Sequence, residues 1–559
     1  MRNRDVYIIL VAILTINAVF FILSANQPFQ GDEVVFPECA KQVIETGKPI
    51  INHSIYRPNF ECLWHPPLYI YLLSANISIF GDNNYSIRAV QGFFSLLSII
   101  LVFFITKNIF KEKDFKDEAS LLAAFLYALS PLLIQGSIVT DIDGGLLNFV
   151  TLLFLFFFVR NSSFYVLVPS LLLVFWSKFS SPVILFVGIM AYYIVNKEWK
   201  KSAKIISLFV ITAILFMITF WIYSSSFDLD FFGPTGNVFS KERVSSNRFT
   251  YLGFVKSAWA LKSFSYFVIP FFVLLFLLLS FYFYKDLISK KDWDKTERKL
   301  LIFNLISLSG IAMFTYLGAS AWGFPKHFHA ALAPMFIFTV GALFLKKKEI
   351  LTFFENKRNI ILIAILFVIL AFYVLIFITD PLMPEFDATA KAADLGYAIV
   401  SILKTFTLYV LIPLIIASIV FYFVKGYSKT DKILILLLLL VIFFSIYINI
   451  LHASTSHSSY YRYGDTGVLE TVNYIKQNNI DSRQVATYGN IGYYFGMSNY
   501  YDIIFVYLDE NTFKEKVIEN NDIRYIIIFQ RDIDRIGEDN MAKFKFTKQI
   551  GSYLIYEKV

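Results

Sequence analysis

The sequence is poor in charged residues. Of its 559 residues, 16% are Asp, Glu, Lys or Arg and 57% are hydrophobic. A soluble protein carries about a quarter charged residues. Apolar runs of about twenty residues, the length of a membrane-spanning helix, recur along most of the chain. The composition therefore excludes an ordinary soluble protein and predicts a polytopic α-helical membrane protein.

Cysteine is also scarce. The chain has only Cys39 and Cys62, and both lie in the polar region that follows the first apolar run. In an oxidising exterior they could pair. The pair would then close a loop of about twenty residues, worth about 3 kcal/mol in the chain-entropy model. The sequence alone leaves the pairing open.

The net charge of +8 collects in particular loops. Basic residues gather on the cytoplasmic loops of membrane proteins, and this placement explains the charge better than a nucleic-acid partner does. We therefore predict contact with membrane lipids and no nucleic acid.

The first apolar run, residues 6–23, has two interpretations. It could be a secretory signal or an uncleaved first span with the N-terminus inside, and its length favours the span. Residues 25–87 are too polar and too proline-broken to cross the bilayer twice, which predicts a first external loop. Within that loop, residues 66–80 are apolar but too short to span, and predict a helix along the membrane surface.

Successive spans cross the membrane in alternating directions, starting from this external loop. On the usual length criterion, the sequence predicts about thirteen spans. Every loop that the alternation assigns to the inside is basic or carries Lys or Arg at its edge, as the positive-inside rule requires. The predicted spans are residues 6–23, 89–106, 119–138, 146–159, 165–176, 183–195, 205–223, 264–284, 300–317, 330–345, 360–378, 403–424 and 433–451.

The composition changes near residue 452. We predict a transmembrane domain over residues 1–452 and a small extracytoplasmic α/β domain over residues 453–559, a normal size for an independent unit. Its expected elements are helices at 466–478 and 511–520 and strands at 484–488 and 522–529. It carries no metal or phosphate motif, so its role is not readable from the sequence.

Ionisable side chains cluster at the predicted external ends of the spans. Keeping a charged side chain at the edge of a membrane costs free energy, so such residues are candidates for a catalytic or binding role. A carboxylate base and several cations suit the transfer of a group from an anionic carrier to a neutral hydroxyl or amine. The four clusters are Asp32 with Glu33, His65 with Arg88, Asp141 and Asp143 with Lys178, and Lys326 with His327 and His329.

Each cluster also has a structural interpretation. Asp32 favours a helix start and could cap a helix beginning at Glu33. The acidic pair before residue 144 could form a polar turn. Lys178 could snorkel to the interface, and Arg88 could be an interfacial anchor. The two late histidines could pack against aromatic rings.

The order of these motifs resembles the GT-C membrane glycosyltransferases that use polyprenyl-phosphate sugars. The likeness is greatest to the protein O-mannosyltransferases and the lipid A aminoarabinose transferases, the glycosyltransferase family 39-like group. The matching segments are Gly31-Asp32-Glu33, Pro66 to Tyr69, Phe80-Gly81, Arg88, Asp141-Ile142-Asp143, Lys178 to Pro182 and Lys326-His327-Phe328 to Pro334. They cover roughly residues 1–345. The span layout and the C-terminal domain extend the likeness.

The resemblance implies a GT-C fold and an inverting transfer from a dolichyl- or undecaprenyl-phosphate sugar to a lipid, glycan or protein acceptor on the external face of the cell membrane. Asp32 would be the general base in an acidic motif with Glu33, oriented by Asp141 or Asp143. The donor phosphate would be held by His65, Arg88, Lys178 and Lys326 or His327. No nucleotide or organic cofactor is expected. A divalent metal stays open, with Glu61 and His329 as further candidate ligands.

Two departures from the family pattern affect these roles. His65 stands where family members often have Lys, so a phosphate contact there is expected to depend on pH near neutrality. The second acidic motif has two Asp residues where one is usual, which leaves its assignment open between them.

Two other functions compete with sugar transfer. One is a transporter or flippase for a lipid-linked or amphipathic substrate, and the other is a membrane-anchored receptor or scaffold. A transporter places ionisable residues near mid-membrane, whereas these spans are nearly free of charge. The sequence therefore favours the transferase and leaves the sugar, the acceptor and the carrier length open.

Overall fold

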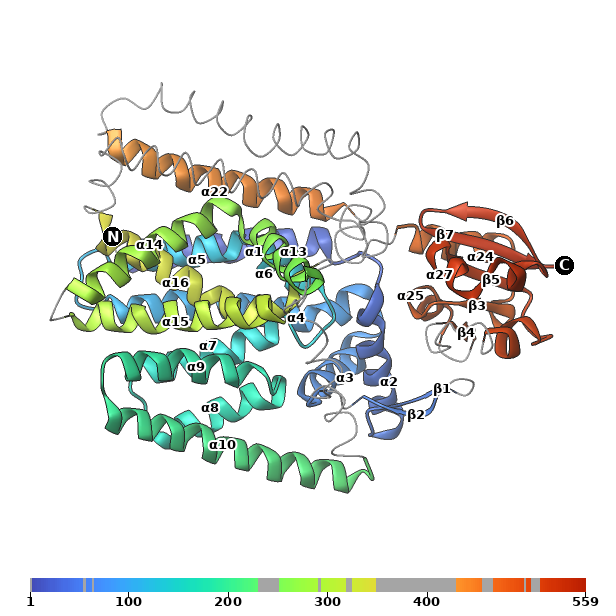
Figure 1. Cartoon of the computed structure of the whole chain (residues 1–559), viewed down its shortest axis with the longest axis horizontal. Coiled ribbons are helices and arrows are strands. Elements are labelled where there is room, and N and C mark those ends of the chain that lie inside the picture. Colours follow the sequence, from blue (N-terminus) through green and yellow to red (C-terminus); the bar gives the residue numbers. More distant parts are fainter. Residues whose placement is uncertain are drawn as a thin grey trace.

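The computed structural model describes residues 3–53, 57–62, 65–229, 251–289, 293–317, 324–347, 429–454, 466–496, 499–503 and 513–559. A bundle of long helices and a smaller C-terminal domain make up this part of the chain (Figure 1). The predicted spans 360–378 and 403–424 lie outside the described residues, as does the middle of the predicted external loop, residues 230–250.

The helices follow the predicted spans closely. They are α1 (Asn3–Ser24), α4 (Asn84–Ile109), α5 (Lys116–Leu129), α6 (Pro131–Ile138), α7 (Gly145–Val159), α8 (Phe164–Ser177), α9 (Ser181–Val195), α10 (Trp199–Ser226), α13 (Tyr251–Val268), α14 (Pro270–Ser289), α15 (Lys295–Tyr316), α16 (His329–Leu345) and α22 (Lys429–Ala453). Among the described helices, five are long and apolar enough to cross a membrane, or six if the bent pair α5–α6 is one span. The number of about thirteen spans stays a prediction.

Two of the predicted spans are each divided into two helices. The span at 119–138 bends by 53° between α5 and α6, because Pro131 has no N–H to continue the helix. The carbonyls of Ala128 and Leu129 accept instead from the side-chain amides of Asn17 and Asn449, at 2.8 and 2.9 Å. A membrane interior requires such replacement partners.

The second division separates α13 from α14. It falls at Ile269, whose φ is 73°, immediately before Pro270. The predicted spans at 119–138 and 264–284 therefore each contain a break between two helices, and α13 also reaches back into the predicted external loop.

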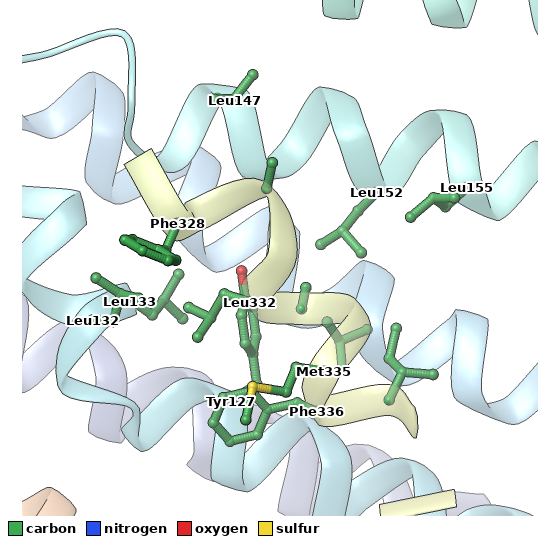
Figure 2. Close-up of a cluster of buried hydrophobic side chains, with 14 of the residues drawn as sticks. Tyr127, Leu132, Leu133, Leu147, Leu152, Leu155, Phe328, Leu332, Met335 and Phe336 are labelled. Carbon is green, nitrogen blue, oxygen red and sulfur yellow. The ribbon is translucent and has the colours of Figure 1, made fainter. Parts of the chain in front are cut away.

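Helix α16 forms the centre of the bundle and is buried along nearly its whole length. Figure 2 shows its side chains Leu332, Met335 and Phe336 among Tyr127 of α5, Leu133 of α6 and three leucines of α7. A helix with neighbours on every side has no polar face. This accounts for the uniformly apolar sequence of α16.

The described residues of the first loop, 25–53, 57–62 and 65–87, form two helices and a hairpin. The short η1 (Gly31–Val34) leads into α2 (Val35–Thr46), followed by strands β1 (Ile50–His53) and β2 (Arg57–Glu61) and by α3 (Leu68–Phe80). Helix α3 fits the predicted surface helix, and the hairpin was not predicted. The residue before α2 is Val34, so the regular helix starts two residues later than the sequence suggested.

A disulfide joins Cys39 of α2 to Cys62 after β2. The pairing that the sequence left open is therefore present, and it ties α2 to the end of the hairpin, three residues before His65.

Loops predicted on the cytoplasmic side meet at the opposite end of the bundle. Lys113 pairs with Asp294 at 3.0 Å, and Lys346 pairs with Glu297 at 3.1 Å. Because these residues come from three different loops, the contacts agree with the alternation of the spans.

The C-terminal domain has a hydrophobic core of its own. Helix α24 (Val468–Gln477) buries one face, and a five-stranded sheet has the order β4-β3-β5-β7-β6. The strands are β3 (Val485–Thr487), β4 (Tyr501–Asp502), β5 (Tyr525–Phe529), β6 (Phe544–Ile550) and β7 (Tyr553–Lys558), with β4-β3-β5 parallel and the others antiparallel. Within the described part, residues 513–520, of the stretch predicted as a helix at 511–520, a π-type turn covers Lys514–Ile518.

Candidate active site at the first-loop end of the bundle

The second acidic motif lies in a buried turn between α6 and α7, residues 139–144. Gln91 of α4 holds this turn, since its amide donates to the Asp141 carbonyl and its Oε1 accepts from Leu146 N at 2.9 Å. A Cβ on Gly145 would lie 2.1 Å from the Gln91 carbonyl. Glycine is therefore required where α7 approaches α4.

Asp143 is the centre of a cluster of charged side chains. Its carboxylate accepts from the ammonium of Lys178, the residue after α8, and its Oδ2 lies 2.8 Å from His327 Nδ1. Lys178 and His327 are themselves 3.3 Å apart. Burial alone would raise the pKa of Asp143, but Lys178 and His327 outweigh it and hold the pKa well below its usual value.

Asp141 forms a second pair beside the first. Its Oδ2 lies 2.5 Å from Lys326 Nζ. The side chains of Lys326 and His327 are 18% and 30% exposed, whereas the other members are nearly fully buried. An anion would therefore reach this Asp143 cluster (Asp141, Asp143, Lys178, Lys326 and His327) from the side of Lys326 and His327.

His65 lies next to the cluster, with its ring 5.4 Å from that of Phe179. Burial and the charge of Lys178 lower the pKa of His65 to about 3. The titration near neutrality expected from the sequence is thus displaced well into the acid range. Among the described residues, His65 Nδ1 is a buried atom with no hydrogen-bond partner.

Glu33 and Arg88 form a separate, fully buried pair at 3.4 Å. Arg88 also donates to the carbonyls of Ala25, Gln27 and Ile138 at 2.8, 2.5 and 2.7 Å.

The carboxylate of Glu33 connects the two acidic motifs. Its Oε1 accepts from Thr140 N at 3.1 Å. Glu33 and Arg88 thus join the first loop to the 139–144 turn and to the end of α6. The hydrogen-bond partners described above for these two residues are not members of the Asp143 cluster. Direct roles for these two residues in catalysis and in phosphate binding stay predictions.

His329 lies deeper, at the start of α16. Its Nδ1 lies 2.8 Å from the Asn148 amide, and its ring fills the space beside Gly136. No group of three or more His, Cys, Asp and Glu side chains suited to a metal occurs in the described ranges. The structure describes the backbone of Asp32 and Glu61 but not their side chains, so a metal site that includes them stays a prediction.

The backbone of Asp32 lies in η1, one residue before Glu33. Because Glu33 contacts Thr140, the turn that carries Asp141 and Asp143 adjoins η1 directly. The structure thus brings both acidic motifs, Lys178 and the Lys326-His327 segment to one end of the bundle.

Gln91 was not among the predicted site residues. A signal was available, because Gln91 is polar inside a predicted span and lies three residues after Arg88, on the same helix face. Thr140 and Phe314, whose ring stacks on His327 at 5.8 Å, had no comparable signal.

The described helices are those of a polytopic membrane protein, with a cluster of ionisable side chains at one end of the bundle. Residues 64–223, less than half of the chain, match the model of the family described as dolichyl-phosphate-mannose-protein mannosyltransferase. No curated protein sequence matches the chain.

Two solved structures share the fold over the whole length. ArnT from Cupriavidus metallidurans bound to undecaprenyl phosphate is 12% identical with a TM-score of 0.60, covering 99% of this chain and 98% of that one. The same protein in the apo state is 11% identical with a TM-score of 0.54, covering 100% and 99%. These matches bear out the GT-C fold that the resemblance in sequence predicted.

Proposed function

We propose that this protein is a membrane glycosyltransferase. It transfers a sugar from a polyprenyl-phosphate donor to a lipid, glycan or protein acceptor on the external face, with inversion. The single observation that carries the proposal is the Asp143 cluster, where two lysines and a histidine from distant segments meet beside the first acidic motif.

The cluster suits a phosphate group whose charge grows during the reaction. A donor phosphodiester carries one negative charge, and the released monoester carries about −1.5 to −2 at pH 7. Cations placed at the leaving oxygen are therefore worth more in the transition state than in the ground state. Lys326 and His327 are the partly exposed members that would meet this phosphate first. The buried Nδ1 of His65, without a partner among the described residues, is a further polar atom beside the same group.

Asp141 and Asp143 pair with the lysines of the cluster and fix the positions of their ammonium groups. A buried ammonium is costly unless a carboxylate pairs with it, because burial removes its hydrating water. Asp143 supplies that partner for Lys178, and Asp141 supplies it for Lys326. The carboxylates thus orient the lysines, and the lysines bind the phosphate.

The transfer itself needs a base on the opposite side of the sugar. Asp32 accepts the proton of the acceptor hydroxyl, the acceptor oxygen bonds to the anomeric carbon, and the bond from that carbon to the phosphate oxygen breaks. The products are the glycosylated acceptor, free polyprenyl phosphate and a protonated Asp32. The family described for residues 64–223 and the undecaprenyl phosphate bound to ArnT support this class of donor.

The test is transfer by the purified protein in lipid vesicles, using radiolabelled sugars on undecaprenyl and dolichyl phosphate. We expect Asp32→Asn to abolish transfer while expression and membrane insertion stay normal. Glu112→Gln is the matched control, because Glu112 is an exposed carboxylate in a loop predicted on the cytoplasmic side.

Three outcomes decide the proposal. Transfer by the wild type that is lost only in Asp32→Asn supports it. Wild-type turnover by Asp32→Asn removes Asp32 as the base. Movement of the donor lipid between leaflets without any transfer would favour the flippase alternative.

A further inference from the structure

The C-terminal domain contacts the first loop on both sides of Asp32. Figure 1 shows this domain at the end of the bundle where α2 and α3 lie. The contact comes from a short segment after β3, formed by α25 (Gly489–Gly492) and the turn Tyr493–Phe495.

Upstream of Asp32, the contact is made by two tyrosines. The Tyr494 hydroxyl accepts a hydrogen bond from the Phe29 backbone N–H at 3.0 Å. The Tyr493 ring meets the Phe29 ring edge-on, with centroids 5.1 Å apart. Phe29 is fully buried, so its N–H depends on this hydroxyl for a partner outside the loop.

Downstream of Asp32, the contact is made by Val34. The position of a Cβ on Gly489 would lie 3.4 Å from the Val34 side chain. The chain is therefore held at Phe29, three residues before Asp32, and lies beside α25 at Val34, two residues after it.

A charged anchor fixes the same segment to the rest of the first loop. The Tyr493 hydroxyl donates to Asp82 at 2.9 Å, and Lys41 of α2 pairs with Asp82 at 2.5 Å. The Lys41 ammonium also lies 4.3 Å from the centre of the Tyr493 ring. Tyr493 therefore contacts three parts of the first loop at once.

The held segment continues into the site. The Phe29 ring lies 4.5 Å from the guanidinium of Arg88, which pairs with Glu33, the neighbour of Asp32. A continuous set of contacts thus runs from Tyr494 through Phe29 and Arg88 to the acidic pair.

We propose that Tyr494 is a positioning residue through which the C-terminal domain holds η1, and with it Asp32, in the geometry for proton removal. The proposal rests on sugar transfer with Asp32 as the base. It gives the C-terminal domain a role in the chemical step, with Tyr493 and Asp82 as the supporting anchor.

The main variant is Tyr494→Phe, which removes the acceptor of the Phe29 N–H and keeps the ring. We expect kcat to fall by about tenfold or more, because small displacements of a reacting group are costly. The donor KM is expected to stay within about twofold, since the Asp143 cluster is untouched. Tyr493→Phe, which loses only the bond to Asp82, is expected to lower kcat by about threefold.

The matched control is Tyr525→Phe in the same domain. Tyr525 also donates to a carboxylate, Glu557, at 3.0 Å, but both residues lie within the C-terminal sheet. This variant is expected to keep wild-type kcat and KM. The unfolding temperature of each variant shows whether it folds.

A second readout does not depend on activity. Hydrogen exchange of the peptide covering residues 27–34 reports the Phe29 N–H directly, and we expect it to speed up in Tyr494→Phe but not in Tyr525→Phe. Wild-type kcat in Tyr494→Phe overturns the proposal, whatever the exchange shows. A lower kcat with unchanged exchange also overturns it, because the effect would then not pass through Phe29. A wild type that transfers no sugar overturns the proposed function itself.

Discussion

Lys326 Nζ lies 2.5 Å from Asp141 Oδ2, although the two residues are 185 positions apart in the sequence. Two residues after Asp141, Asp143 holds Lys178 and His327 in the same way. One short turn therefore positions cations that come from two other parts of the chain.

The two partners of the Lys326–Asp141 pair are expected to affect donor binding in opposite directions. Lys326→Met removes a cation and should weaken the binding of undecaprenyl phosphate by about tenfold, near the 1.4 kcal/mol of one lost charged contact. Asp141→Asn frees the same cation from its partner and should leave binding unchanged or tighter. Binding is measured with labelled undecaprenyl phosphate.

The control for this comparison is the pair Lys113–Asp294 at the opposite end of the bundle, at 3.0 Å. Lys113→Met should bind the lipid as the wild type does. Equal losses in Lys326→Met and Asp141→Asn would mean that the pair is only structural.

Asp143→Asn is expected to lower stability at neutral pH by about 3–5 kcal/mol, because it leaves Lys178 buried without its charged partner. The pKa of Asp143 in the folded state lies below the ordinary 3.8. Its contribution is therefore complete above about pH 4 and is lost as the pH falls below that value. Thermal unfolding from pH 3 to 8 should show a constant difference from the wild type above pH 5 that narrows below pH 4. If the difference in unfolding temperature between wild type and variant changes between pH 5 and 8, a group other than Asp143 is responsible for the pH dependence.

His65→Gln tests the lowered pKa of His65. The unfolded chain takes up a proton at this residue near pH 6.5, whereas the folded chain resists it until about pH 3. The wild type should therefore lose stability as the pH falls from 7 to 5, and His65→Gln should lose less over the same range. Unfolding temperatures that fall in parallel would show that His65 titrates normally.

Removal of the Cys39–Cys62 disulfide, in the double variant Cys39→Ser with Cys62→Ser, is expected to cost about 3 kcal/mol for a bridge of this span. The cysteines are 23 residues apart, and Cys62 lies three residues before His65. Reductant should lower the unfolding temperature of the wild type and leave that of the double variant unchanged. The mass shift on alkylation, with and without reductant, measures the bridge directly.

Gly136→Ala is expected to destabilise the bundle by about 1–3 kcal/mol through overpacking. The added Cβ would lie 2.1 Å from the buried ring of His329. The second change His329→Ala removes that ring, so Gly136→Ala should cost less in the His329→Ala background than in the wild type. A cost equal in both backgrounds would exclude the contact as the cause.

Several features of the fold could be predicted from the sequence because they depend on local hydrophobicity. The span at 89–106 lies within α4, Asn84–Ile109, and the strand at 522–529 contains β5, Tyr525–Phe529. The break at Pro131 could also have been anticipated, but its carbonyl partners Asn17 and Asn449 are 111 and 320 residues away from their acceptors. No local pattern predicts such a pairing.

The candidate site likewise has some features that were predicted from the sequence and others that were not. The types of the residues and their common end of the bundle were predicted from motif order and from alternation of the spans. The sequence grouped Arg88 with His65, whereas in the structure Arg88 pairs with Glu33. The contact of Tyr494 with Phe29 joins residues 465 positions apart and had no sequence signal.

The sequence by itself determined that the chain is a membrane protein with charged groups gathered at one side, because hydrophobic length and charge placement are properties of short segments. Only the tertiary structure decided which carboxylate holds which cation, that His65 is neutral, and that the C-terminal domain contacts the acidic loop. Those features depend on burial and on distances between residues far apart in the chain, which no segment determines alone.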